Sequence, residues 1–156
     1  MLFKCRKRPA RGVLIHESIP TVIYTTVCAY NRRRWLANPQ VHAAIRAAWL
    51  RHMSWVVTAY VLMPDHVHFF AQPGGGKKWL PFDDWVSVWK RGMARVLKNR
   101  EYRWQAASFH HRIRCYEDVI NKRIYMDENP VRGGLVKQVA DWPYRGELVE
   151  RDLWWP

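Results

Sequence analysis

Two histidines separated by one residue are the first feature of this sequence that could do chemistry. His66 and His68 lie in the segment 60–72, where a proline and an aspartate interrupt two short apolar runs. Side chains at i and i+2 of a β-strand point to the same face of a sheet. Both imidazoles would then project side by side, a geometry that can hold one divalent cation. A pair of surface histidines that only form hydrogen bonds is the alternative interpretation.

A tyrosine and an asparagine four positions apart form a second chemical set. Tyr125 and Asn129 fall in the segment 117–129, for which we predict a helix, and residues i and i+4 of a helix share a face. If that face lies over the histidine pair, a phenol, an amide oxygen and two imidazoles converge. A core aromatic and a helix C-cap are the more ordinary roles of these two residues, and the spacing alone leaves both open.

The chain is strongly basic. It has 26 Lys and Arg against 13 Asp and Glu, a formal net charge of +13 and a pI of about 10.2. Polyanions are therefore the expected partners, with nucleic acid first. Ten Trp residues occur among these bases; most should be core, but Arg and aromatic side chains also stack on unpaired bases. Candidate DNA-binding residues are Arg32, Arg33, Lys90, Arg91, Arg112, Arg114 and Arg132.

The first two of these arginines lie in a basic turn, Asn31–Arg34, which is equally consistent with a solvated loop and with phosphate contacts. Lys90 could reach a phosphate or assist a leaving 3′ oxygen. His110 and His111 form a second histidine pair, but neighbouring residues of a strand face opposite ways, so at most one should lie near the site.

The elements that must position these side chains alternate along the chain. Asn38 and Pro39 are typical of an N-cap and a first helical turn, and Pro130 predicts the end of the third helix. The order is strand, helix, strand, strand, helix, strand, helix. This order predicts an α+β, ferredoxin-like antiparallel sheet with helices on one face, plus a C-terminal helix that carries the tyrosine. The expected strands are 21–30, 55–63, 66–72 and 109–114, and the expected helices are 38–52, 81–99 and 117–129.

The rest of the chain suggests one domain, 1–156, with a basic arm at 1–18 and a tail at 140–156. Three cysteines without a C-x-x-C pair argue against a disulfide framework. We find no signal peptide and no apolar run long enough for a membrane span, and we expect a cytoplasmic protein. The glycine-rich loop 73–78 lacks the residues that a P-loop needs at both ends.

Three segments of this sequence resemble the REP-associated tyrosine transposases, a branch of the single-tyrosine HUH nucleases. They are DENPVRGGLV at 127–136, PDHVH at 64–68 and WQAASFHHRIR at 104–114, and the resemblance spans residues 21–142. In this family the HUH triplet is His, hydrophobic, His, which corresponds here to His66-Val67-His68. The expected order of strands and helices agrees with the family's fold.

The resemblance implies a single-stranded DNA endonuclease and strand-transferase in which Tyr125 becomes linked to a 5′ phosphate. His66 and His68 would bind Mg²⁺ or Mn²⁺, and Asn129 would be the third ligand, where related transposases often have Gln. Met126 departs mildly from the family's YIxxNP pattern. Tyr116 is a competing phenol, but it lacks an amide four residues later.

The weak acidity of a tyrosine phenol is a second reason to expect a metal ion at the site. A tyrosine has a pKa of about 10, so the phosphodiester must be made more electrophilic, which a divalent ion does. Because a phosphotyrosine keeps the bond energy, rejoining needs no ATP. Single-stranded, hairpin-forming DNA is the implied partner, and the protein would act as a monomer or a homodimer. A non-catalytic DNA-binding domain is the main alternative, and an RNA-binding domain a weaker one, because the strands lack an RNP-type signature.

Overall fold

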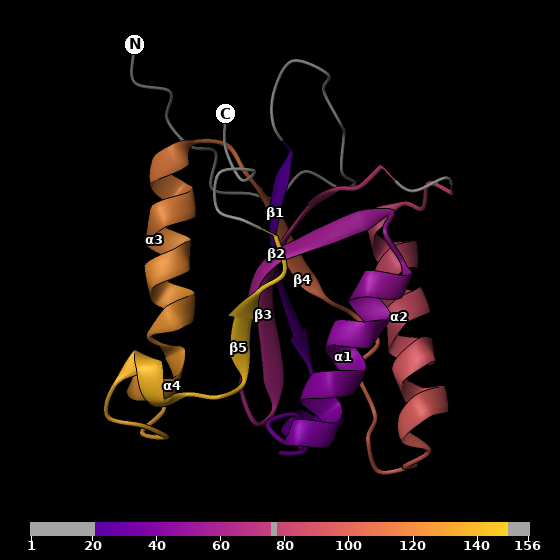
Figure 1. Ribbon diagram of the computed structural model, residues 1–156, viewed down its shortest axis with the longest axis horizontal. Coiled ribbons are helices and arrows are strands. Elements are labelled where there is room, and N and C mark those ends of the chain that lie inside the picture. The colour runs from indigo at the N-terminus through magenta and orange to yellow at the C-terminus, as the bar shows by residue number, and fades with distance from the viewer. Residues whose placement is uncertain (1–20, 76–77, 150–156) are drawn as a thin grey trace.

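The structure, a computed structural model, describes residues 21–75 and 78–149. Its centre is a five-stranded antiparallel sheet with the order β4-β1-β3-β2-β5 (Figure 1). The strands are β1 Val22–Cys28, β2 Trp55–Leu62, β3 His66–Pro73, β4 Phe109–Ile113 and β5 Arg145–Glu147. The helices are α1 Pro39–Arg51, α2 Phe82–Leu97, α3 Tyr116–Asp127 and α4 Asn129–Arg132, with 3-10 turns η1 Tyr30–Arg32 and η2 Val139–Asp141. The arm expected at 1–18 lies outside the described residues.

The helix cap and the turn that we predicted from the sequence are both present. The Asn38 side chain accepts a hydrogen bond from the backbone nitrogen of Val41 at 3.0 Å, and Pro39 is the first residue of α1. The turn between β2 and β3 closes when the nitrogen of Met63 donates to the carbonyl of His66 at 2.8 Å. The four strands and three helices that we predicted are all present, with bounds that differ from the expected ones by a few residues at most.

The main core lies between one face of the sheet and the two helices α1 and α2 (Figure 1). Indole rings dominate it, and Trp49 contacts Trp89, Tyr60 and Phe69 at ring-centroid distances of 6.0, 5.1 and 5.4 Å. Most of the described tryptophans are buried, as expected. This apolar layer fixes the sheet rigidly beneath the face that carries the two histidines.

The helix that carries Tyr125 lies on the opposite face of the sheet from α1 and α2 (Figure 1). Val119 and Met126, seven residues apart on α3, bury their side chains against Val22, Tyr24 and Phe70. Helices therefore lie on both faces of the sheet, because α3 covers part of the face opposite α1 and α2 (Figure 1). α3 is also not the last element, since α4, η2 and β5 follow.

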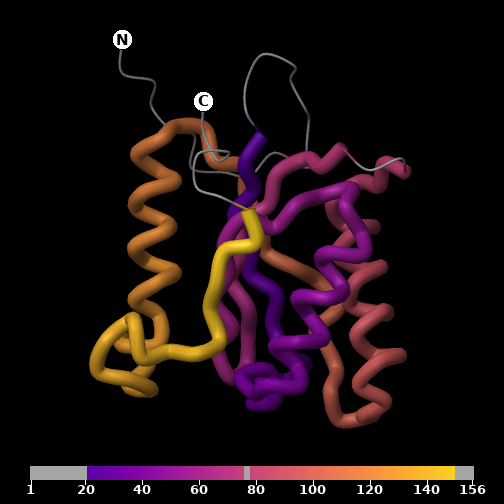
Figure 2. The backbone as a smooth tube through the Cα atoms, in the orientation of Figure 1, coloured from indigo at the N-terminus to yellow at the C-terminus, as the bar shows by residue number. Residues whose placement is uncertain are grey.

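The fifth strand, β5, was not predicted. Its three residues include a glycine and no β-branched side chain, so they carry no strand signal. Figure 2 shows the chain passing from α4 to the outer edge of β2, where β5 pairs with residues 59–61. The indole nitrogen of Trp142 donates to the carbonyl of Leu62 at 2.9 Å, so residues that we assigned to a tail pack on the sheet.

Gly146 of β5 lies close against Tyr60 of β2. A Cβ atom at this position would lie 2.7 Å from the hydroxyl oxygen of Tyr60. That hydroxyl is fixed, because the guanidinium of Arg46 donates to it at 2.7 Å and the Nε2 atom of His42 lies 2.8 Å away. None of the described helices is long and apolar enough to cross a membrane.

Candidate metal and nucleophile site

The two histidines of β3 face each other. Their Nε2 atoms are 3.1 Å apart, and their ring centroids are 4.7 Å apart at an interplanar angle of 80°. Val67 between them points into the core on the α1 and α2 side. The period of a β-strand thus places both imidazoles on one surface, as predicted.

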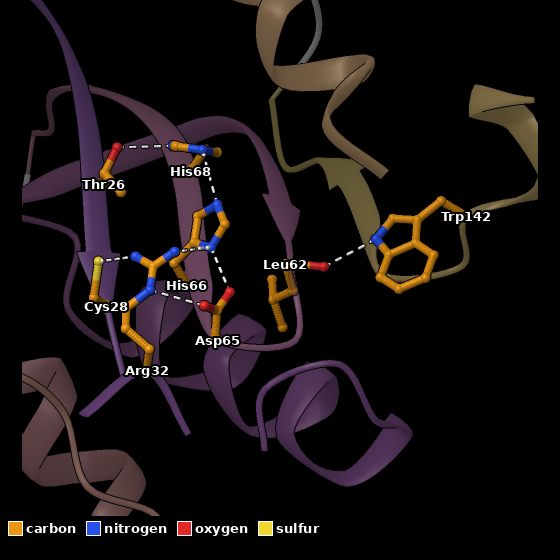
Figure 3. A network of polar contacts seen from close by, with 8 residues as sticks. All are labelled: Thr26, Cys28, Arg32, Leu62, Asp65, His66, His68 and Trp142. Atoms are coloured by element: carbon orange, nitrogen blue, oxygen red, sulfur yellow. Dashed lines mark hydrogen bonds and ion pairs between the residues drawn. The ribbon is translucent and has the colours of Figure 1, made fainter. Parts of the chain in front are cut away.

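Each imidazole is oriented through its other nitrogen (Figure 3). The Nδ1 atom of His66 lies 2.7 Å from a carboxylate oxygen of Asp65, and the Nδ1 atom of His68 lies 2.8 Å from the hydroxyl of Thr26. The second contact follows from strand register, because Thr26 is paired with His68. Metal-binding histidines are held in this way, with the remaining nitrogen left for the ion.

Arg32 completes this polar network (Figure 3). Its Nε atom lies 2.8 Å from Asp65, its Nη1 atom donates to the sulfur of Cys28 at 2.9 Å, and its Nη2 atom lies 3.4 Å from Nδ1 of His66. Asn31 and Arg32 both adopt left-handed backbone conformations, with φ of 52° and 54°. We predicted that Arg32 contacts DNA; in this structure its guanidinium instead forms an ion pair with Asp65.

The electrostatics keep both imidazoles neutral. Burial lowers the pKa of His66, and Arg32 lowers it further, while Asp65 acts in the opposite direction. Burial also lowers the pKa of His68 to about 3, with smaller contributions from His66 and three cationic side chains, Arg32, Arg132 and Lys122. At neutral pH each ring therefore has a lone pair to offer, and two lone pairs that face each other repel unless a proton or a cation lies between them.

Asp65 remains ionised beside this pair. Its burial would raise the pKa of the carboxyl group, but the hydrogen bond and charge of His66, together with Arg32, outweigh burial, and the pKa lies below its ordinary value. A carboxylate accepting from Nδ1–H stabilises the imidazole tautomer whose Nε2 atom is unprotonated.

The donor set fits a divalent cation. Two metal–nitrogen bonds of about 2.1 Å at a right angle place the nitrogens about 3 Å apart, close to the observed 3.1 Å. The side-chain nitrogen of Asn129 is buried without a hydrogen-bond partner among the described residues, whereas an amide binds a hard cation through its oxygen. Within residues 21–75 and 78–149, no three His, Cys, Asp or Glu side chains lie together in an arrangement that could hold a metal ion. An ion would therefore need the amide, water or a substrate oxygen, a set that suits Mn²⁺ better than Mg²⁺.

Tyr125 lies beside the histidine pair. Its ring centroid is 6.2 Å from that of His68 at an interplanar angle of 71°, and the side chain is 50% exposed. The guanidinium of Arg132 stacks 4.1 Å from the centre of the Tyr125 ring and donates to the Tyr125 carbonyl at 2.6 Å. The structure thus brings a solvent-accessible phenol, two imidazoles and one cationic side chain together.

We expected one unbroken helix from Tyr125 to Asn129, but the structure has two. α3 ends at Asp127, and Asn129 is the first residue of α4, with Glu128 between them in right-handed helical geometry. Pro130 explains the break, because it cannot donate a backbone hydrogen bond but suits the first turn of a new helix. Tyr116, the competing phenol, begins α3, and nine residues of helix put it about 13 Å from Tyr125 along the axis.

Besides Thr26 and Asp65, two further residues at the site were not predicted. The ring of Tyr24 stacks on His68 at 5.6 Å and 15°, and the ammonium of Lys122 lies 5.5 Å from the centre of the Tyr24 ring. Burial, followed by the nearby Tyr125, raises the pKa of Tyr24. The sequence held partial signals for both, since Tyr24 and Thr26 share one face of β1 and Lys122 lies three residues before Tyr125.

The other five candidate DNA contacts lie away from the imidazoles. Lys90 donates to the carbonyls of Gln105 and Ala106 at 2.9 and 3.4 Å, so it fixes the loop before β4. Arg33 forms an ion pair with Glu101. The remaining three are Arg91 on α2, Arg112 on β4, paired with Ile23 of the main core face, and Arg114 just after β4.

The second histidine pair divides as expected between the two faces of β4. His111 lies 5.7 Å from the Tyr24 ring, on the face that carries the site. His110 contacts Phe82 of α2 at 4.9 Å, on the opposite face.

Comparison with known proteins agrees with these features. No family model matches the chain. The chain is 33% identical over 131 residues to the REP-associated tyrosine transposase of Escherichia coli, covering 78% of this chain and 73% of that protein. It is 32% identical over 111 residues to a putative REP-associated tyrosine transposase of Haemophilus influenzae, covering 60% and 59% of the two chains.

A solved structure of a REP-associated tyrosine transposase bound to a REP hairpin superposes with a TM-score of 0.69 at 26% identity. The match covers 92% of this chain and 82% of that one. Sequence identity and fold agree over most of the chain, and both agree with the resemblance of its motifs. The chain belongs to the REP-associated tyrosine transposase family.

Proposed function

We propose that this protein is a metal-dependent single-stranded DNA endonuclease and strand-transferase that forms a 5′-phosphotyrosine intermediate on REP-like hairpin DNA. The observation that carries this proposal is the Tyr125 ring, 6.2 Å from the ring of an imidazole whose Nε2 atom faces that of His66. The relative solved with a REP hairpin supports the choice of DNA.

In this reaction the Tyr125 oxygen forms a bond to phosphorus, and the bond between phosphorus and the 3′ oxygen breaks. The proton lost by the phenol is balanced by the proton gained by the released 3′ hydroxyl. Reversal by a 3′ hydroxyl rejoins DNA and regenerates the tyrosine, so no nucleotide cofactor is consumed.

The chain supplies the groups around that phosphate. Arg132 orients the phenol ring, and Lys122, one turn before Tyr125, lies near enough to His68 to lower its pKa. Both are cations suited to a phosphate oxygen. His66, His68 and Asn129 would hold Mg²⁺ or Mn²⁺. A bound ion would polarise a non-bridging oxygen and orient the scissile bond.

The test is incubation with a single-stranded REP-like hairpin and Mn²⁺, followed by a denaturing gel. We expect a DNA-linked protein band that disappears in Tyr125→Phe and with a chelator, and that persists in Tyr116→Phe. An adduct that survives Tyr125→Phe contradicts the assignment of the nucleophile.

The second candidate, a non-catalytic hairpin-binding domain, predicts binding without any adduct. It draws on the basic composition, with 26 Lys and Arg against 13 acids. The ring contact between Tyr125 and His68 favours the enzyme, because binding alone has no need of a phenol beside two neutral imidazoles.

We further propose a ferredoxin-like classification, since four strands in the order β4-β1-β3-β2 are joined by α1 and α2 as in the split βαβ arrangement. We propose a monomer as the active unit, because Tyr125 and His68 make their contact within one chain. We propose a cytoplasmic location on the basis of the DNA substrate.

A further inference from the structure

We infer that Tyr30 and Arg103 form a stacking subsite for one unpaired nucleobase next to the scissile phosphate. The inference rests on the proposed function, because the occupant is the single-stranded part of the same DNA. Neither residue belongs to the chemical groups described above.

The subsite is a preformed aromatic–guanidinium stack. The guanidinium carbon of Arg103 lies 4.5 Å from the centre of the Tyr30 ring, and Tyr30 is 41% exposed. Their backbones are joined, since the nitrogen of Tyr30 donates to the carbonyl of Arg103 at 2.8 Å. One residue to either side, Ala29 and Trp104 form a β-bridge. The stack is therefore held in place before any ligand arrives.

The two residues that flank Arg103 in the sequence belong to an aromatic cluster that is buried or partly buried. Trp35 stacks on Tyr102 at 4.8 Å and 9°, and Trp104 packs edge-on against Trp35 at 4.9 Å. Trp104 also meets Trp89 of α2 at 5.3 Å, which connects the surface stack to the main core. A platform with such backing loses little conformational freedom when a base stacks on it.

The same turn of chain reaches the histidine site. Two residues after Tyr30, Arg32 binds Asp65 and lies 3.4 Å from His66, and the nitrogen of Ala29 donates to the carbonyl of Asp65 at 2.8 Å. Arg32 adopts a left-handed conformation that side chains of its kind rarely adopt, directly after Asn31, a residue type that tolerates it, and such strain concentrates at functional sites. The turn therefore fixes the exposed ring of Tyr30 at a set offset from the proposed metal site.

The chemistry of this surface selects a nucleobase. Aromatic rings and guanidinium planes both stack on the π-face of unpaired bases, with little dependence on sequence. Three exposed arginines, Arg32, Arg33 and Arg34, follow Tyr30 in the sequence, the first two in ion pairs with Asp65 and Glu101. These charges suit the phosphates on either side of a stacked base.

The test combines protein variants with DNA that carries a single abasic position, scanned along the strand next to the hairpin. Affinity is measured by fluorescence anisotropy with Tyr125→Phe as the parent protein, so that no covalent adduct forms. We expect one abasic position to weaken binding by the parent about tenfold, and Tyr30→Ala to weaken binding to intact DNA by a similar factor. At that position the two losses should not add, because both remove the same stack.

Tyr30→Leu keeps an apolar side chain without a π-face and should behave like Tyr30→Ala, whereas Tyr30→Phe should bind like the parent. Tyr116→Ala, at another exposed tyrosine, should bind normally. Additive losses at every abasic position, or unchanged binding by both Tyr30→Ala and Tyr30→Leu, would overturn the inference. If the wild type forms an adduct and the coupling is absent, this inference fails alone. If the coupling is present and the wild type forms no adduct, the proposed reaction fails and the subsite stands.

Discussion

Asp65 is the residue on which the geometry of the histidine pair depends. It accepts from Nδ1 of His66 at 2.7 Å and binds Arg32 at 2.8 Å, so it joins the imidazole to the basic turn after β1. Its negative charge also makes the imidazole a stronger electron donor. Removing that charge should lower the affinity of the Nε2 atom of His66 for a metal ion, although Asp65 itself would not contact the ion.

We therefore expect Asp65→Asn to raise the Mn²⁺ concentration needed for half-maximal adduct formation by about 10–100-fold. A titration of Mn²⁺ in the gel assay measures it. The matched control is Asp84→Asn at an exposed aspartate in the first turn of α2, which should leave the requirement unchanged. An unchanged requirement in Asp65→Asn would contradict the role of Asp65 in strengthening His66 as a ligand.

At the residue scale, the sequence predicted those side-chain positions that follow from the repeat of a single strand or helix. The shared face of His66 and His68 follows from strand alternation, and the closeness of Tyr125 to that face was anticipated through the family's motif. Thr26 could not be predicted, because its contact with His68 depends on the register of β1 against β3. Asp65 was read only as a turn residue, because a turn signal does not reveal which side chain it supports.

At the scale of elements, α3 determines where the nucleophile lies. Met126, next to Tyr125 in sequence, is fully buried against the sheet, whereas Ile124 on its other side is 51% exposed. The buried contact therefore sets the rotation of α3, and with it the direction of the phenol.

We expect Met126→Ala to lower the free energy of unfolding by about 2–5 kcal/mol, the usual cost of deleting a buried side chain of this size. Ile124→Ala should change it by less than about 0.5 kcal/mol. Urea denaturation measures both. Equal effects of the two substitutions would contradict the packing of α3 described here.

The sequence predicted the strands and helices better than it predicted which face of the sheet each helix covers. Four strands and three helices follow from apolar period, caps and turns. The side of the sheet that α3 covers does not, because Val119 and Met126 would suit either face of an apolar sheet. β5 was missed because its pairing to β2 depends on backbone hydrogen bonds and on Trp142, rather than on its own three residues.

At the scale of the whole molecule, charge governs the encounter with DNA. The net charge of +13 is carried by 26 Lys and Arg spread along the chain, while the proposed site uses few of them. Affinity should therefore depend mainly on phosphate contacts that release counterions.

We expect about four such contacts to give a slope of about −3 for log affinity against log salt, or roughly 60-fold weaker binding at 200 mM than at 50 mM salt. Anisotropy titrations over that range measure the slope. Arg132→Gln should reduce its magnitude by about 0.7 if Arg132 binds a phosphate. A slope near zero would exclude a backbone-driven interaction.

The close approach of Gly146 to Tyr60 has a consequence for solubility. A methyl group there would collide with a hydroxyl oxygen 2.7 Å away that Arg46 and His42 hold firmly, so β5 rather than the tyrosine would have to yield. The unpaired amides of β2 would then be open to a strand from another molecule. We expect Gly146→Ala to self-associate in light scattering, whereas Gly92→Ala, at an open position on α2, should remain dispersed. The absence of a side chain at Gly146 would thus allow β5 to cover the edge of β2 and so prevent self-association through that edge.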